Sequence, residues 1–116
     1  MSPEKRERLV SAGIDVDEAL SRFLDNESLF ERFLNKFLED RNYLKLGEAI
    51  ASGDNEAALA ASHTLKGLCS NLSMKRLTEL FTLQVKAYRA EDPDLAASMM
   101  PEISKAYDET VAAISE

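Results

Sequence analysis

The chain of 116 residues carries 14 basic and 21 acidic side chains, a formal net charge of −7, with one histidine and one cysteine. This length fits a single compact domain, and the acidic balance argues against nucleic-acid binding, which requires clustered cations. One cysteine cannot form an intramolecular disulfide, and one cysteine with one histidine cannot assemble a Cys/His zinc site. No stretch approaches the roughly 18 apolar residues of a membrane span. We therefore expect a cytoplasmic protein, without membrane insertion, whose partners are proteins.

Apolar residues recur at spacings of three and four along the whole chain, which predicts an all-α fold. A short first helix is predicted from about Asp17 to Leu24. The phenylalanine and leucine pairs that follow Ser28 predict one long helix toward Ser52, or two helices with a joint near Asp40–Asn42.

Residues that begin or interrupt helices mark out the second half of the chain. Asp54 is predicted to cap a helix that runs to about Leu72, and Ser73 to cap a further helix over 74–90. Asp92 and the following proline begin the last helix, in which Pro101 predicts a kink or a division into two pieces.

Four long amphipathic helices joined by short polar loops most simply form an up-down-up-down four-helix bundle. The short additional N-terminal helix is expected to lie across one end of it. The sequence thus predicts a bundle domain over residues 13–116, preceded by an N-terminal extension over residues 1–12.

The helix predicted after Asp54 carries the single histidine, His63, on its outer face. At about 100° per residue, this side chain lies opposite the apolar stripe of the helix. That stripe comprises Ala58, Ala61, Leu65, Leu68, Cys69 and Leu72. The outer face around the histidine comprises Leu59, Ala60, Lys66, Gly67 and Ser70. A helical glycine costs about 1 kcal/mol relative to alanine, and Gly67 leaves the imidazole open on one side.

An exposed imidazole beside a cation suits phosphoryl transfer. Neutral imidazole is a good nucleophile near neutral pH, and a neighbouring ammonium favours the neutral form. The transition state of phosphoryl transfer requires mainly positioning and cations near the phosphoryl oxygens. Lys66, three residues after His63, would supply such a cation, and Gly67 would leave space for the group.

The string His63-Thr64-Leu65-Lys66-Gly67 resembles the phospho-acceptor motif of histidine-containing phosphotransfer (HPt) domains, in which His-x-x-Lys-Gly lies mid-helix on a four-helix bundle. The resemblance extends from about residue 13 to the C-terminus. Further segments that resemble the family are Gly13–Val16, Ala19–Phe23, Phe37–Asp40 and Ala51–Asp54.

This resemblance implies a phosphorelay intermediate in two-component signalling. His63 would accept a phosphoryl group from the aspartate of one response-regulator receiver domain and pass it to another, with a hybrid sensor kinase in the same relay. Lys66 would support the phosphoryl oxygens, while Gly67, Leu59, Ala60 and Ser70 would form the surface that the partner approaches. The Mg²⁺ belongs to the receiver, so no cofactor or metal site is expected here. The protein would be a monomeric carrier and not an enzyme.

The sequence departs from the family pattern at two places. The family often has glycine at the position of Ser73, where a serine N-cap is expected to preserve the turn. Many members hold the imidazole with a glutamine or glutamate on the next helix, and the matching register here gives Val85. Gln84 is then the candidate orienter if that helix is rotated slightly. The missing partner leaves open an alternative, a pseudo-HPt adaptor that binds receiver or kinase domains without being phosphorylated.

Other functions of a helical bundle fit the sequence less well. Haem or ligand storage would need His63 inside the bundle, and the Cys-x-x-Cys-His attachment string is absent. A di-iron site would need Glu-x-x-His pairs on two helices, which one histidine excludes. Cys69 lies on the apolar stripe and is interpreted as a buried structural thiol.

Overall fold

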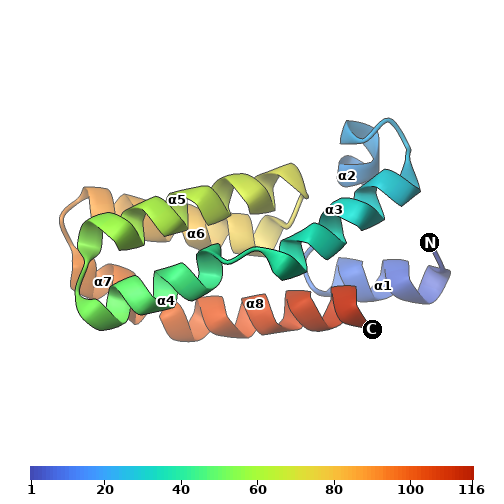
Figure 1. The fold of residues 1–116 in the computed structure, drawn as a ribbon. Helices are drawn as coiled ribbons and strands as arrows, with labels where there is room; N and C mark the ends of the chain where they lie inside the picture. The colour runs from blue at the N-terminus through green and yellow to red at the C-terminus, as the bar shows by residue number, and fades with distance from the viewer.

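Four helical rods, each antiparallel to the next, form a bundle that measures 42 × 24 × 20 Å (Figure 1). The computed structural model describes residues 1–116. Its eight helices are α1 (Pro3–Ser11), α2 (Val16–Arg22), α3 (Glu27–Glu39), α4 (Asn42–Ser52), α5 (Asn55–Asn71), α6 (Lys75–Arg89), α7 (Pro93–Ser98) and α8 (Met100–Ser115). The pair α3 and α4 makes one rod, α5 and α6 one each, and α7 with α8 the fourth. The predicted all-α bundle is confirmed, and none of these helices combines the length and apolar character that crossing a membrane requires.

Side-chain caps begin several of the helices, and those at Asp54 and Asp92 lie where the sequence predicted helix starts. The side-chain oxygens of Asn26, Asp54 and Asp92 each accept a hydrogen bond of 3.0 or 3.1 Å from the backbone N–H three residues on. Such caps satisfy backbone donors that the first turn leaves without partners. The N-terminus of the histidine-bearing helix, α5, is therefore fixed by local chemistry at Asp54.

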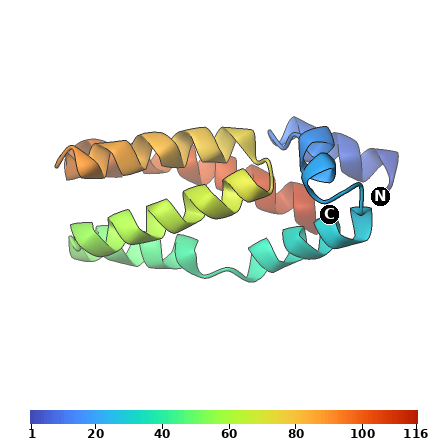
Figure 2. The same ribbon diagram turned by 90° about the horizontal axis from the view of Figure 1, so that it is seen from above.

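Two of the rods are broken where the sequence indicated a joint. Asp40, in extended conformation between α3 and α4, accepts a 2.8 Å hydrogen bond from the backbone N–H of Asn42. Figure 2 shows this break as an irregular link between α3 and α4, which follow one another end to end along the bundle. The second break, between α7 and α8, precedes Pro101, whose ring removes one backbone N–H.

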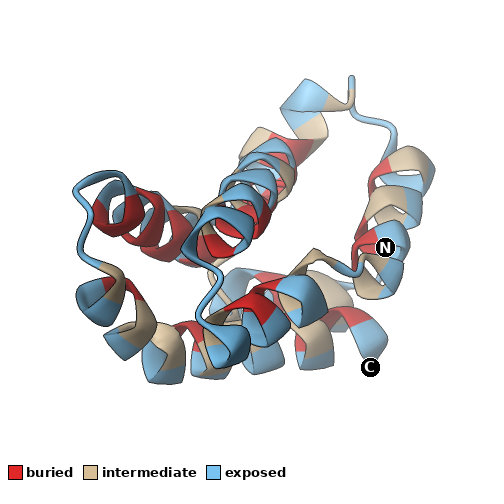
Figure 3. Ribbon diagram, turned by 60° about the vertical axis from the view of Figure 1, so that its left-hand side comes forward, coloured by how far each residue is buried: buried red, intermediate tan, exposed pale blue.

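One hydrophobic core runs the length of the bundle. Figure 3 shows the buried residues on the helix faces that turn toward one another and the exposed residues outside. Its largest fully buried side chains include Phe30, Phe81, Leu34 and Ile103. On the α4 and α8 side, the rings of Tyr43 and Tyr107 stack with centroids 3.7 Å apart. One face of α5 thus packs against the core, and its opposite face is exposed to solvent.

The first twelve residues contain a helix that the hydrophobic pattern did not reveal. Helix α1 packs along the C-terminal part of α8, and its Leu9 belongs to the bundle core. After α1 the chain pairs with the turn between α5 and α6, through an isolated antiparallel bridge between Ile14 and Met74. Gly13 has a φ of +93°, and a Cβ there would come within 3.0 Å of the Cβ of Arg76. A side chain at this point would prevent the close approach.

The prediction that Ser73 caps α6 was wrong. The N-cap is Met74, which makes no side-chain cap, and Ser73 lies before it with a φ of +54°. This left-handed conformation is the one that glycine adopts freely. Here the serine is buried, donates a hydrogen bond to Glu18 (3.0 Å) and accepts one from Arg22 (2.7 Å). Contacts with α2 therefore stabilise the turn that ends α5.

Candidate functional site

Helix α5 presents one face to the bundle and the opposite face to solvent. Its buried residues are Ala58, Ala61, Ser62, Leu65 and Cys69. Leu68, predicted to belong to this set, is only half-buried and lines a shallow hollow with Phe33 and Phe37 of α3. The small residues at the centre of the buried face allow α4 and α6 to pack closely against α5.

The exposed face of α5 gathers the side chains that the sequence singled out. His63, Ala60, Gly67 and Ser70 are exposed, and Leu59 and Lys66 are half-buried. Their spacings of three and four residues place them as neighbours on one helical surface. The structure therefore brings the predicted site residues together, with Gln84 as the exception.

Gly67 occupies open space beside the histidine. A Cβ built at this position meets no other atom within 4 Å, apart from its own helix and neighbours. Neither close packing nor an unusual backbone conformation requires glycine here, since the residue lies inside a regular helix. The unfavourable helix propensity of this glycine is therefore not explained by the fold.

Lys66 is the cation of this surface. None of the ion pairs in the structure involves it, so its ammonium group has no carboxylate partner. On the other flank of His63, Ala60 and Thr64 line a groove between α4 and α5 that also contains Lys45. An anion bound at the histidine would therefore find one unpaired ammonium group on the same helix.

Gln84, the predicted partner of the imidazole, turns inward instead. Its side chain is fully buried and accepts a 2.8 Å hydrogen bond from the hydroxyl of Ser62. Its amide nitrogen donates to the carbonyl of Ala96 at 3.1 Å and contacts the sulfur of Met100 at 3.3 Å. The prediction that Gln84 orients His63 was wrong, because α6 is not rotated in the direction that this contact would need. Val85, at the register of the family's orienting residue, is buried.

Ser62 is the residue of this region that sequence reasoning missed. It precedes the histidine directly, yet it is completely buried and bonded to Gln84. A serine inside a helix is usually assigned to the polar face, so the residue type alone does not indicate that Ser62 is buried. The signal that would have found it is geometric, because Ser62 follows Ala58 by four residues on the buried stripe.

Cys69 is buried in the core, as predicted. Burial, with a smaller effect of Asp40, raises the pKa of this thiol to about 12. The side chain is thus an inert thiol in the core and takes no part in the exposed face of α5.

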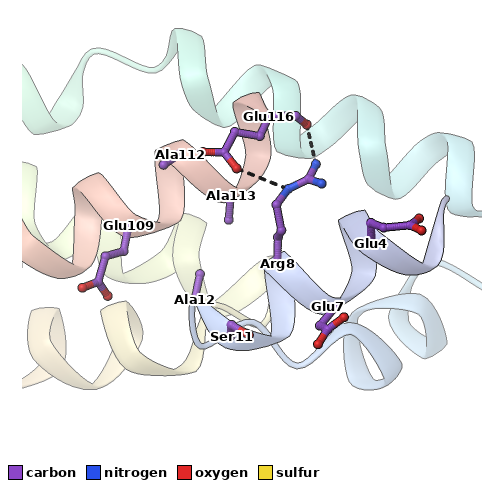
Figure 4. Close-up of a pocket in the computed structure, with 9 residues that line it drawn as sticks. All are labelled: Glu4, Glu7, Arg8, Ser11, Ala12, Glu109, Ala112, Ala113 and Glu116. Carbon is purple, nitrogen blue, oxygen red and sulfur yellow. Dashed lines mark hydrogen bonds and ion pairs between the residues drawn. The ribbon is translucent and has the colours of Figure 1, made fainter.

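A separate polar hollow lies far from the histidine, between α1 and α8 (Figure 4). Arg8 points across it and pairs with the carboxylate of Glu116, while Glu4, Glu7 and Glu109 line its edges. Nowhere in the structure do three or more His, Cys, Asp or Glu side chains group as metal ligands would.

The family model of the Hpt domain matches residues 28–113 of this chain. This range includes nearly all of α3, the whole of α4 to α7, most of α8 and the surface around His63. No curated protein and no solved structure matches the chain.

Proposed function

The chain belongs to the Hpt domain family, whose members act in phosphotransfer within two-component signalling, and from this premise we propose a specific role for His63. In this proposal His63 accepts a phosphoryl group from the aspartate of one receiver domain and passes it to the aspartate of another. The observation that carries the proposal is the single histidine of the chain, exposed in the middle of α5, with Lys66 and Gly67 one turn further on.

The transfer is a displacement at phosphorus. The lone pair of one imidazole nitrogen attacks the phosphorus of the receiver's acyl phosphate, and a P–N bond forms. The P–O bond breaks, the aspartate leaves as a carboxylate, and the other ring nitrogen keeps its proton. Transfer to the second receiver is the same reaction in reverse. Exposure of His63 supports this chemistry, because both partners must bring an aspartate in line with the ring.

The neighbouring residues have separate roles in this proposal. Lys66 places positive charge beside the phosphoryl oxygens, which is the main help that phosphoryl transfer needs. Gly67, Leu59, Ala60 and Ser70 form the surface against which a receiver domain rests. The Mg²⁺ is held by the receiver, and this chain acts as a monomeric, cytoplasmic carrier between receiver domains and a hybrid sensor kinase rather than as an enzyme.

Transfer of labelled phosphate tests the proposal directly. Purified receiver domains, charged with 32P-labelled acetyl phosphate and Mg²⁺, are mixed with the protein. We expect a label on this chain that is labile in acid and stable in base, as a phosphoramidate is. His63→Gln should abolish it, while Ser115→Ala, an exposed change at the far end of α8, should not. Labelling that survives His63→Gln would refute the assignment.

A second candidate is an adaptor that binds a receiver or kinase domain without accepting phosphate. The observation that favours it is the inward position of Gln84, which leaves the imidazole without the orienting partner common in the family. The same mixture separates the two candidates. An adaptor would co-elute with a receiver domain in gel filtration and stay unlabelled.

A further inference from the structure

We propose that the buried hydrogen bond between Ser62 and Gln84 positions His63, by fixing how far α5 is rotated against α6. This inference rests on the proposed function, because it concerns how the same histidine is presented to a receiver. It assigns to Gln84 a role that works through Ser62 and the helix, without contact with the imidazole.

The two side chains form the core's only hydrogen bond between buried side chains of different helices. Both are completely buried, and the hydroxyl of Ser62 donates to the amide oxygen of Gln84 at 2.8 Å. The amide nitrogen is also occupied, by the carbonyl of Ala96 in α7. Gln84 is thereby held from both sides, and its oxygen is presented to α5 in one orientation.

Apart from Ser62, the buried face of α5 is apolar, and Ala58, Ala61, Leu65 and Cys69 all pack in the hydrophobic core. Ala58 and Ala61, both N-terminal to Ser62, present only single methyl groups to the core. Dispersion contacts of methyl groups are non-directional, whereas a hydrogen bond weakens steeply with misalignment. A buried polar pair therefore selects one arrangement among several that apolar packing alone would accept.

His63 is the next residue after Ser62, so a rotation of α5 is transmitted to it in full. A turn of about 10° moves an atom at the outer edge of a helix, about 5–6 Å from the axis, by about 1 Å. A misplacement of about 1 Å can slow a reaction about 100-fold. Because no side chain of the structure hydrogen-bonds to the imidazole, the position of the helix is its principal restraint.

Three variants separate positioning from simple stabilisation. Ser62→Ala removes the hydroxyl and leaves the amide oxygen of Gln84 unpaired. The double variant Ser62→Ala/Gln84→Met removes both polar groups at nearly constant volume, which should restore most of the stability. Thr110→Val is the matched control, since Thr110 is equally buried but bonds only within α8. The thermal midpoint of each variant is measured by circular dichroism.

The readout is the rate of phosphoryl transfer from the charged receiver domain, as a function of receiver concentration. We expect Ser62→Ala and the double variant to lower the rate at saturating receiver about threefold to tenfold, with the half-saturating concentration unchanged within about twofold. Thr110→Val should transfer at the wild-type rate. Transfer by the double variant at the wild-type rate would overturn the proposal, because stability alone would then explain Ser62→Ala.

A second readout keeps this inference separate from the proposed function. Diethylpyrocarbonate modifies histidine, and the chain has only one. If the wild-type protein takes no phosphate label from any receiver domain, the proposed function fails. The rate at which diethylpyrocarbonate modifies His63 then still tests whether the Ser62–Gln84 hydrogen bond positions the imidazole. A change of about twofold or more in the modification rate of His63 in both Ser62 variants, with no change of this rate in Thr110→Val, supports the proposal. Equal rates in all four proteins overturn it.

Discussion

Substitution of Gly67 separates the stability of α5 from its proposed function. An added Cβ meets no atom within 4 Å, so Gly67→Ala should be accommodated without strain. Replacing a helical glycine with alanine stabilises a protein by about 0.5–1 kcal/mol, which for a domain of this size raises the Tm by about 2–4 °C. Phosphoryl transfer should become slower in the same variant, because the methyl group lies beside His63 where a receiver approaches. Gly67→Leu should lower the transfer rate about tenfold or more.

Gly47 provides the matched control for this prediction. It also lies inside a helix, α4, is exposed, and has no atom within 4 Å of an added Cβ. It lines the groove beside Tyr43 and Tyr107 and not the surface around His63. Gly47→Ala should therefore raise the Tm by the same amount, as measured by thermal unfolding, and leave the rate of phosphoryl transfer unchanged. Unchanged transfer in Gly67→Leu, or equal slowing in both alanine variants, would refute the steric reasoning.

Side chains at three other positions give measurable outcomes. Lys66→Ala should slow phosphoryl transfer about tenfold, because a cation beside the phosphoryl oxygens is lost. Lys66→Arg should retain most of the rate. Transfer at the wild-type rate by Lys66→Ala would show that the lysine takes no part in the reaction. The pKa of Glu18 is lowered to about 2, first by the hydrogen bond from Lys75 and then by those from Ser73 and Arg22. Since this value lies below the ordinary 4.5, the stabilisation is full above pH 4.5 and is lost as the pH falls toward 2. The wild-type Tm should thus fall more steeply across this range than that of Glu18→Gln, and parallel curves would contradict the argument. Burial raises the pKa of Cys69 to about 12. Iodoacetamide at about pH 8 should therefore modify this thiol in the urea-unfolded chain and not in the native protein. Rapid reaction of the native thiol would contradict its burial.

Local sequence determined most of the helices and the exposed position of the histidine. The caps at Asn26, Asp54 and Asp92 and the division before Pro101 depend on residues within one turn of each boundary, so their chemistry can be read without a tertiary structure. The outward direction of His63 follows in the same way from the spacing of apolar residues in a single helix. These features do not require knowledge of which helices meet.

Features that depend on two helices at once could not be read in this way. Gln84 bonds to Ser62 and not to His63 because of the rotation of α6 against α5, and one residue along a helix turns a side chain by about 100°. The left-handed conformation of Ser73 is held by the hydrogen bond that it accepts from Arg22 and the one that it donates to Glu18, both in α2, about fifty residues earlier. The sequence alone thus determined that His63 stands outside the bundle, and only the tertiary structure decided which buried polar groups hold its helix in place. Periodicity specifies the faces of one helix, whereas a hydrogen bond between helices depends on their relative rotation and register.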